Sequence, residues 1–383
     1  MGEYDTLGSR RRRAPEAALT RRRAVMADVG RLAGVSHQTV SRVVNGSPHV
    51  RTQTRQRVLE AMLALGYRPN PAARALATGR SNTLGVVSFD TTLYGPASTL
   101  VGIERAAHEA GYFIIVASLR ELDRPSVTEA VERLCRHGVD GILAITPHED
   151  AADALLHAPG DVPLVAVEAG PDHAVPVAAI DQFAGGAAAT RHLLDLGHET
   201  VWHIAGSPDF LESRRRLEGW RSTLGAARAD VPPPLAGDWS ARAGYDLGRR
   251  LGADPAVSAI FVANDQMALG VLRAMHERAR RIPEEVSVVG FDDIPEAPYF
   301  LPPLTTVRQD FDQMGSHGVR LLLKMIETGR APEQSARLRP ELVVRASTSV
   351  VAASPLRAGP SSPASRPAEP QRAKTIEVGL CDR

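Results

Sequence analysis

From Leu84 onward the chain alternates between short uninterrupted runs of Val, Ile and Leu and longer segments whose apolar residues have helical spacing. A strand that is apolar at every residue is buried on both faces, as in parallel sheets covered by helices. The first block has expected strands at 84–89, 112–117, 141–145 and 164–167 and expected helices at 100–110 and 127–137. After Asp181 the second block has expected strands at 201–205, 259–262 and 286–289 and expected helices at 185–196, 214–224, 241–251 and 267–278. The pattern predicts an α/β fold with two doubly wound parallel-sheet subdomains.

A single expected helix at 310–327 follows the last strand of the second block and does not start a third block. The chain is therefore expected to cross back to the first block. We divide the core, residues 82–349, into a first subdomain of 82–180 and 308–338 and a second of 181–307 and 339–349. Residues 350–383 turn to Pro, Ser, Ala and Arg without periodicity, which is typical of a disordered tail.

The region before this core has the pattern of two short helices around a tight turn. Gly34 relaxes the turn, and Ser36 is the expected N-cap of the second helix. Apolar residues at helical spacing should hold the two helices together: Val29, Leu32, Ala33, Val40, Val43 and Val44. The side chains left exposed on the second helix can hydrogen-bond base edges in a DNA major groove: His37, Gln38, Ser41 and Arg42. The pattern indicates a helix-turn-helix, and an ordinary helical hairpin with a polar face is the alternative.

The charge of the chain is distributed in a way that favours DNA as a partner. The formal net charge is only +1, yet residues 10–80 carry fifteen arginines against three acidic residues, a balance of +12. Residues 1–9 add −2, so residues 81–383 carry −9. A basic N-terminal region on an acidic body is expected when one part of the chain binds phosphates and the other does not.

The N-terminal region continues with a third helix, expected at 52–65, with Thr52 as its N-cap and Gly66 as its end. Its apolar stripe is Val58, Leu59, Met62 and Leu63. A short helical pattern then ends at Gly79 and has Leu76 as its one large apolar residue, so it has too few core positions to be stable alone. We expect a disordered basic arm at 1–24, a helix-turn-helix head at 25–69, and a hinge helix and linker at 70–81.

Two residues weaken the first helix of the expected head. Val25 stands at its N-cap position and offers no side-chain oxygen to a backbone N–H. Gly30 stands where a helix favours alanine, at a cost of about 0.5–1 kcal/mol.

Several other classes of protein are disfavoured by motifs that the chain does not contain. It has no run of about 18 apolar residues, and the segment at 14–20 is too short and too polar for a signal peptide, so we expect no membrane span and a cytoplasmic, nucleoid-associated location. Its two cysteines, Cys135 and Cys381, do not suggest a metal site or a disulfide framework. Nucleotide-binding, nucleophile-elbow and zinc-protease motifs are missing, so neither a cofactor nor catalysis is expected. A sugar-active enzyme and a transport-type binding protein remain the alternatives.

Six motifs together carry a family resemblance: LAGVS at 32–36, QTVSRVVN at 38–45, GYRPN at 66–70, VANDQMALG at 262–270, SVVGFDD at 287–293 and PPLTTV at 302–307. With these, residues 25–349 resemble the LacI/GalR family of bacterial transcription repressors. The resemblance implies a three-helix DNA-binding head, a hinge helix, and a core like the periplasmic sugar-binding proteins, in which two subdomains enclose an effector. It also implies a homodimer on a near-palindromic operator. Residues 351–383 contain no leucine repeat that could form a tetramer, so the dimer is the expected assembly.

For the head, the resemblance implies which residues contact double-stranded DNA. His37, Gln38 and Arg42 align with base-reading positions, and Leu76 aligns with a residue that wedges between base pairs in the minor groove. The other expected DNA contacts are Ser41, Asn45, Arg55, Asn70 and Ala73, with Arg55 near a phosphate. Folding of the hinge only on the operator would give a route for control.

For the core, Asn264 follows an expected strand, and open α/β sheets bind ligands at the carboxyl ends of their strands. The resemblance implies that the effector is held by polar side chains at Glu168, Arg216, Asp292 and Gln309 and by apolar walls at Leu93, Pro96 and Trp239, and it places Val177 in the pocket. Arg216 belongs to a run of three arginines that is ordinarily a solvated surface. A galactoside-like or other neutral sugar that relieves repression is the predicted effector. A purine or a partner protein is the alternative within the family.

Overall fold

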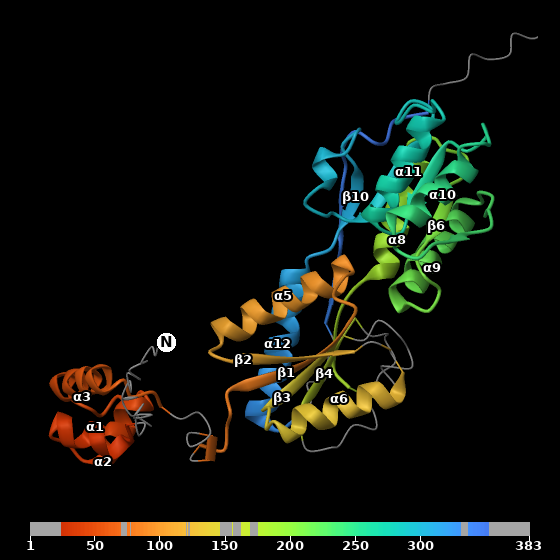
Figure 1. The fold of residues 1–383 in the computed structure, drawn as a ribbon. Coiled ribbons are helices and arrows are strands. Elements are labelled where there is room, and N and C mark those ends of the chain that lie inside the picture. The colour runs from red at the N-terminus through yellow and green to blue at the C-terminus, as the bar shows by residue number, and fades with distance from the viewer. Residues whose placement is uncertain are drawn as a thin grey trace, which may run out of the picture. The chain divides into compact units, whose positions relative to one another are not determined.

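The computed structural model describes residues 24–69, 75, 76, 78–119, 121, 123–145, 155, 162–168, 175–330 and 336–351. The chain divides into two compact units, one up to Thr83 and one from Leu84 onward (Figure 1). The expected arm at 1–24 and the expected tail at 350–383 lie almost wholly outside the described residues. Within the described part of the chain, no helix is both long enough and apolar enough to cross a membrane.

The N-terminal unit is a three-helix head made of α1 (Met26–Ala33), α2 (His37–Val44) and α3 (Thr52–Leu65). Gly34 and Gly66 end α1 and α3 in the left-handed conformation, with φ of 64° and 59°. The Ser36 hydroxyl accepts a hydrogen bond from the backbone N–H of Thr39 at 3.2 Å, so Ser36 caps α2 as predicted. The core of the head is small and is formed by Val29, Ala33, Val40, Val43, Val58 and Ala61.

Several expected details of the head are wrong. Leu32, Leu59 and Leu63 are exposed, at 56%, 43% and 83%, because α3 meets α1 and α2 along the narrow stripe of Val58 and Ala61. The small side chains of Ala33 and Ala61 let the helices approach closely, which leaves no room for a second row of leucines. Arg51, not Thr52, occupies the N-cap position of α3.

The two expected weak points of α1 have local compensations. The backbone N–H of Val25 donates to the Asp28 carboxylate at 3.0 Å, so a side chain reaching back from the first turn satisfies it. A Cβ at Gly30 would lie 2.9 Å from the Val35 carbonyl oxygen. The turn into α2 therefore requires a residue without a Cβ, and alanine would not be the better choice here.

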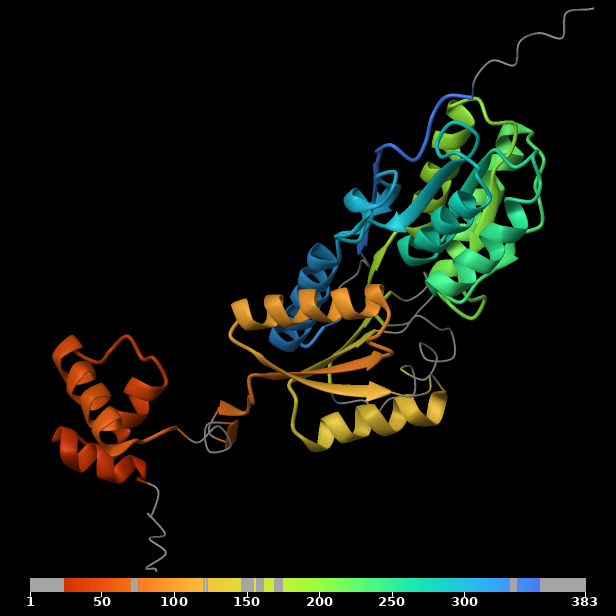
Figure 2. The same ribbon diagram turned by 45° about the horizontal axis from the view of Figure 1, so that its top comes forward.

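The core contains two six-stranded sheets, as the alternating pattern predicts. The first sheet has the order β11-β5-β4-β3-β1-β2, with parallel pairing from β11 to β1. Its strands are β1 (Thr83–Phe89), β2 (Phe113–Leu119), β3 (Gly141–Ile145), β4 (Leu164–Val167), β5 (Val177–Ile180) and β11 (Ala336–Leu338). One face packs on α5 (Tyr94–Glu109) and α12 (Phe311–Thr328), and the other packs on α6 (Arg124–Arg136) (Figure 2).

The second sheet has the order β12-β10-β9-β8-β6-β7, in which the β10–β12 pair is antiparallel. Its strands are β6 (Trp202–Ala205), β7 (Leu235–Ala236), β8 (Ala259–Val262), β9 (Ser287–Asp292), β10 (Thr305–Arg308) and β12 (Glu341–Val343). On one face lie α8 (Gln182–Asp195) and α9 (Leu211–Ala227), and on the other lie α10 (Ala241–Leu251) and α11 (Asp265–Glu277). Continuous apolar strands such as β8 are buried on both faces, as parallel sheets require.

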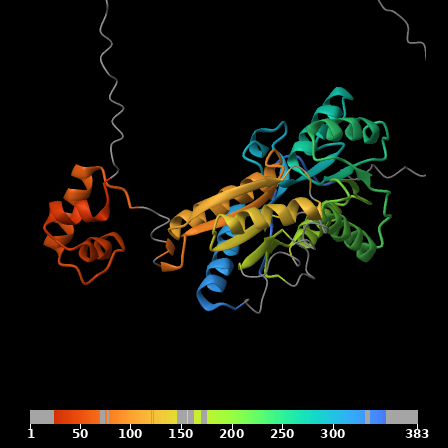
Figure 3. The same cartoon turned by 60° about the horizontal axis from the view of Figure 1, so that its bottom comes forward.

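The chain crosses between the two sheets three times: after β5, after β10 and after β11. The second crossing returns α12 to the first sheet, where it contacts β3, β4 and β5 (Figure 3). The sequence pattern did not predict β5, β7, β10, β11 or β12. β7, β11 and β12 have only two or three residues, and β5 (VAAI) and β10 (TTVR) contain alanine or polar residues in place of a continuous run of large apolar ones.

Helices α10 and α11 cross so closely that side chains would not fit between them. A Cβ on Gly244 would lie 2.0 Å from the Met267 carbonyl oxygen, and a Cβ on Gly270 would lie 2.0 Å from the Ala241 carbonyl oxygen. Gly225 on α9 offers a contrast, because a Cβ there would meet no atom within 4 Å.

We predict that Gly244→Ala lowers the free energy of unfolding by about 1–3 kcal/mol, because the methyl group must push α10 and α11 apart. Gly225→Ala should raise it by about 0.5–1 kcal/mol, since alanine restricts the unfolded chain and favours the helix. Urea denaturation followed by tryptophan fluorescence measures both, because Trp202, Trp220 and Trp239 all belong to the second subdomain. Equal unfolding midpoints for the two variants would contradict the close crossing.

Candidate DNA-reading helix and core cavity

A cavity of about 320 Å³ lies in the core where strands of both sheets end. The first subdomain contributes the loop after β1, Glu168 directly after β4, and Phe311 at the start of α12. The second subdomain contributes Asn264, the N-cap of α11 after β8, and Asp292 at the end of β9, together with residues of α9 and of the segment before α10. The cavity is therefore formed by elements that are far apart in the sequence.

Eight of the nine residues expected at the effector pocket line this cavity: Leu93, Pro96, Glu168, Arg216, Trp239, Asn264, Asp292 and Gln309. Val177 does not line it. This residue begins β5 and packs, 4% exposed, in the core beneath α6. Its expected place in the pocket is wrong, because β5 buries this side chain in the core of the first subdomain.

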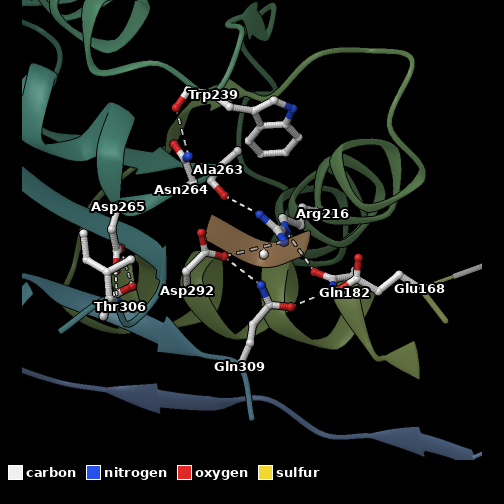
Figure 4. Close-up of polar contacts among 12 residues, drawn as sticks. Glu168, Gln182, Arg216, Trp239, Ala263, Asn264, Asp265, Asp292, Thr306 and Gln309 are labelled. Carbon is white, nitrogen blue, oxygen red and sulfur yellow. Dashed lines mark hydrogen bonds and ion pairs between the residues drawn. The ribbon is translucent and has the colours of Figure 1, made fainter. Parts of the chain in front are cut away.

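The guanidinium of Arg216 is the centre of a buried polar network (Figure 4). Its Nε donates to Gln182 Oε1 at 2.8 Å and its Nη1 donates to the Ala263 carbonyl oxygen at 2.5 Å. Its Nη2 lies 3.8 Å from Asp292 Oδ1. The guanidinium carbon stacks 3.9 Å from the centre of the Phe291 ring. Arg216 is only 4% exposed, so it is not part of a solvated arginine surface.

Two amides close this network into a ring. Gln309 Nε2 donates to Asp292 Oδ1 at 2.7 Å, and Gln182 Nε2 donates to Gln309 Oε1 at 2.7 Å. Each amide thus donates to one member of the ring and accepts from another, so the orientation of both amides is fixed. Burial raises the pKa of Asp292 to about 6, although Arg216 and the bond from Gln309 oppose this effect.

Three cavity residues have left-handed backbone conformations: Glu168 with φ of 66°, Trp239 with φ of 72° and Asp292 with φ of 110°. Residues other than glycine rarely adopt such conformations unless the surrounding structure holds them, and they cluster at functional sites. Asn264 holds Trp239 in place, since its Nδ2 donates to the Trp239 carbonyl oxygen at 3.0 Å. Its Oδ1 caps α11 through the N–H of Met267. Asn264 therefore positions the wall of the cavity as well as lining it.

Asp265 does not line the cavity but holds the elements around it through two buried hydrogen bonds. Its Oδ1 accepts from the Thr306 hydroxyl at 2.6 Å and its Oδ2 accepts from the Ile294 N–H at 2.9 Å. These bonds tie α11 to β10 and to the loop after β9, which fixes the backbone that carries Asp292.

Among the lining residues that were not predicted from the sequence are three aromatic side chains and an acidic one: Tyr94, Phe210, Phe311 and Glu212. Tyr94 and Phe311 meet edge to face at 5.7 Å, and Phe210 and Trp239 do so at 5.5 Å. Glu212 precedes Arg216 by four residues on α9, so helical spacing alone would have placed it on the same face.

Glu168 and Glu212 form an acidic pair at the cavity. The Thr99 hydroxyl lies 3.0 Å from Glu168 Oε1, while Glu168 Oε2 is buried without a donor among the described residues. Burial raises the pKa of Glu168. Burial and the charge of Glu168 raise the pKa of Glu212 well above its usual range. Two neighbouring carboxylates that are both buried tend to share one proton.

The head presents the polar face of α2 to solvent. His37, Gln38 and Arg42 are exposed and Ser41 is partly exposed. Asn45, at the C-cap of α2, donates to the Ser41 hydroxyl at 3.4 Å. On α3, Arg55 donates to the Ser47 carbonyl oxygen at 2.6 Å, so it anchors the loop that follows α2.

The expected hinge is only partly described. Leu76 lies in helical backbone and is 91% exposed. Asn70 and Ala73, the other expected contacts in this segment, lie outside the described residues.

Comparison with known proteins gives matches over both units. A model of the lacI family of bacterial regulatory proteins matches residues 25–70, and a model of a periplasmic binding protein-like domain matches residues 190–348. The lactose operon repressor of Escherichia coli is 34% identical over 323 residues, which cover 84% of this chain and 89% of the repressor. The HTH-type transcriptional repressor PurR of Mannheimia succiniciproducens is 30% identical over 334 residues, which cover 86% of this chain and 100% of the relative.

Solved structures agree with these matches. The Lac repressor dimer bound to operator and the anti-inducer ONPF has a TM-score of 0.79 at 33% identity and covers 86% of this chain and 100% of that chain. A complex of the transcriptional regulator CelR with cellobiose has a TM-score of 0.64 at 33% identity and covers 85% of this chain and 100% of that chain.

We predict that Arg216→Met lowers the free energy of unfolding by about 3–5 kcal/mol, because it leaves the buried Asp292 without its cation. Arg215→Met is the matched control on the same helix. Arg215 pairs with Glu218 at 2.7 Å, but the side chains are 37% and 53% exposed, so its loss should cost about 1 kcal/mol or less. Urea denaturation followed by fluorescence compares them, and similar losses would contradict a structural role for the buried ring.

Proposed function

This chain belongs to the LacI family of bacterial regulatory proteins and is a DNA-binding transcriptional regulator, and we propose that it represses sugar-utilisation genes until a small sugar binds in the core cavity. We propose no catalytic step and no cofactor for this chain. Its partners are double-stranded operator DNA, the sugar and a second copy of the chain, and it acts in the cytoplasm on the nucleoid. The relatives are named as the lactose operon repressor, the ribose operon repressor and the HTH-type transcriptional repressor PurR.

The head is the part that we propose to read the operator. His37, Gln38 and Arg42 are exposed near the start and middle of α2, where a recognition helix meets base edges. Ser41 and Asn45 continue the same helix, and Arg55 supplies positive charge near the backbone of the DNA. Leu76, whose large apolar side chain is almost fully exposed, fits a wedge between base pairs. The family resemblance adds Asn70 and Ala73 as expected DNA contacts.

One observation carries the choice of a sugar: Trp239 stands as a fixed aromatic wall beside the buried ring of Arg216, Asp292 and Gln309. Sugars have one apolar face and a set of paired hydroxyl groups, so they need an aromatic surface next to groups that donate and accept. The cavity provides both, with Leu93 and Pro96 as further apolar wall. The solved CelR complex in the comparisons is named for cellobiose, which supports the same class of ligand.

We predict that Arg42→Ala lowers the preference for one base pair in each operator half-site by about 1–3 kcal/mol, since a bidentate contact with guanine is lost. Arg55→Ala removes a positive charge and the bond to Ser47, so it should weaken all DNA sequences alike. Selection from a randomised operator library measures both profiles. If the two variants change the base preferences in the same way, the proposed orientation of α2 is wrong.

The effector is tested by fluorescence anisotropy of a labelled operator complex titrated with galactosides, glucosides and purines. We expect a sugar to lower operator affinity, and Asp292→Asn to bind operator but to respond about tenfold less, because the charge facing Arg216 is lost. Asp246→Asn is the control, since this carboxylate is exposed on α10 and pairs only with Arg242 among the contacts described. A purine that releases operator while no sugar does would overturn the proposal.

A further inference from the structure

The cavity is more acidic than a neutral sugar needs. Three carboxyl groups line its buried part, those of Glu168, Glu212 and Asp292, against the single guanidinium of Arg216 among the described lining residues. Arg216 is already committed to Gln182, Ala263 and Asp292. The acidic pair of Glu168 and Glu212 therefore has no cation of its own in the described contacts.

Glu168 is the most under-satisfied group at the cavity. It is 6% exposed, and its Oε2 has no donor among the described residues except the Glu212 carboxyl when that carboxyl is protonated. Its Oε1 faces the Thr99 hydroxyl, but that hydroxyl also lies 2.9 Å from the Gly95 carbonyl oxygen, and its single hydrogen can serve only one of them. A buried carboxylate oxygen without a donor is costly, so the site is suited to a donor that arrives with a ligand.

We propose that the effector carries a primary amine that binds between the carboxyl groups of Glu168 and Glu212, which makes it an amino sugar rather than a neutral one. This inference rests on the proposed sugar effector and specifies its class. An ammonium group has three N–H donors and one positive charge, so it can donate to both carboxylates and balance the charge that they carry.

The proton balance of binding follows from the same geometry. Without ligand, Glu168 and Glu212 together hold one proton, because two ionised carboxylates side by side in a buried site repel each other. An ammonium group takes the place of that proton, and the proton leaves to the solvent. Arg216 and Asp292 also face this pair: burial raises the pKa of both glutamates and the charge of Arg216 lowers it, and the charge of Glu168 adds to burial in raising the pKa of Asp292.

The aromatic side chains are consistent with an amino sugar. Tyr94, Phe210, Trp239 and Phe311 line the cavity in two edge-to-face pairs. Aromatic faces attract cations as well as the apolar face of a sugar ring.

Isothermal titration calorimetry of the full chain at pH 7 tests the proposal with two matched sets of sugars. One set is glucose, glucosamine and N-acetylglucosamine, and the other is galactose, galactosamine and N-acetylgalactosamine. We expect the amine of at least one set to bind about tenfold more tightly than its neutral parent and its acetylated form, since bonds to charged groups are the stronger ones. Titrations in phosphate and in Tris, which differ in ionisation enthalpy, should show net release of protons with the amine.

Two variants test whether the tighter binding of the amine and the release of protons depend on Glu212. Glu212→Gln removes one carboxyl and the shared proton, so the advantage of the amine and the release of protons should both disappear. Glu218→Gln, exposed on the same helix, is the control and should keep both. The comparison of sugars and the proton release in the unaltered chain need no variant, so a folding defect in Glu212→Gln would leave the test valid.

The outcomes separate this inference from the proposed function. If a neutral sugar binds as tightly as its amine and still releases operator, the amino-sugar inference is overturned and the sugar-responsive repressor stands. If neither the amino nor the neutral sugars bind, both are overturned.

Discussion

The buried ion pair between Arg216 and Asp292 is the interaction on which the core site depends. Neither group is stable in a protein interior unless its partner and its remaining hydrogen bonds are in place. Gln182 and Gln309 supply those bonds. Gln182 is the first residue of α8, directly after the first crossing between the sheets, and Gln309 lies between β10 and α12, at the second crossing. The N–H of Asp181 also donates to the carbonyl oxygen of Leu338, at the third crossing.

The polar floor of the cavity is thus built on the segments that join the two subdomains. A change in the angle between the subdomains must pass through these three crossings. A ligand that bonds to Asp292 or Arg216 acts on the same network that holds two of them, so it can favour one angle over another by its different affinity for the two states. This is a physical route from a bound sugar to a change in the core, and it needs no contact between the sugar and DNA.

The sequence predicted the two parallel sheets and most of the cavity residues. It missed several strands, one buried residue and the exposure of two leucines, each for a physical reason. Uninterrupted apolar strands such as β3 and β8 were placed to the residue because burial on both faces leaves a clear pattern. β5 (VAAI) and β10 (TTVR) left no such pattern, because alanine and threonine interrupt the run of large apolar residues. The eight pocket residues implied by the resemblance line one cavity, whereas Val177 packs in the core of the first subdomain. Exposure of Leu32 and Leu63 could not be predicted, because spacing identifies a helix face but not how much of it a small head can cover.

The most direct test of the account is the affinity of the full chain for its effector sugar, measured with and without saturating operator DNA. If the sugar releases the operator through two states of the protein, operator must weaken sugar binding by the same factor by which sugar weakens operator binding, because the coupling free energy is reciprocal. The account predicts equal factors in the two directions. An affinity for sugar that is the same with and without operator would contradict it.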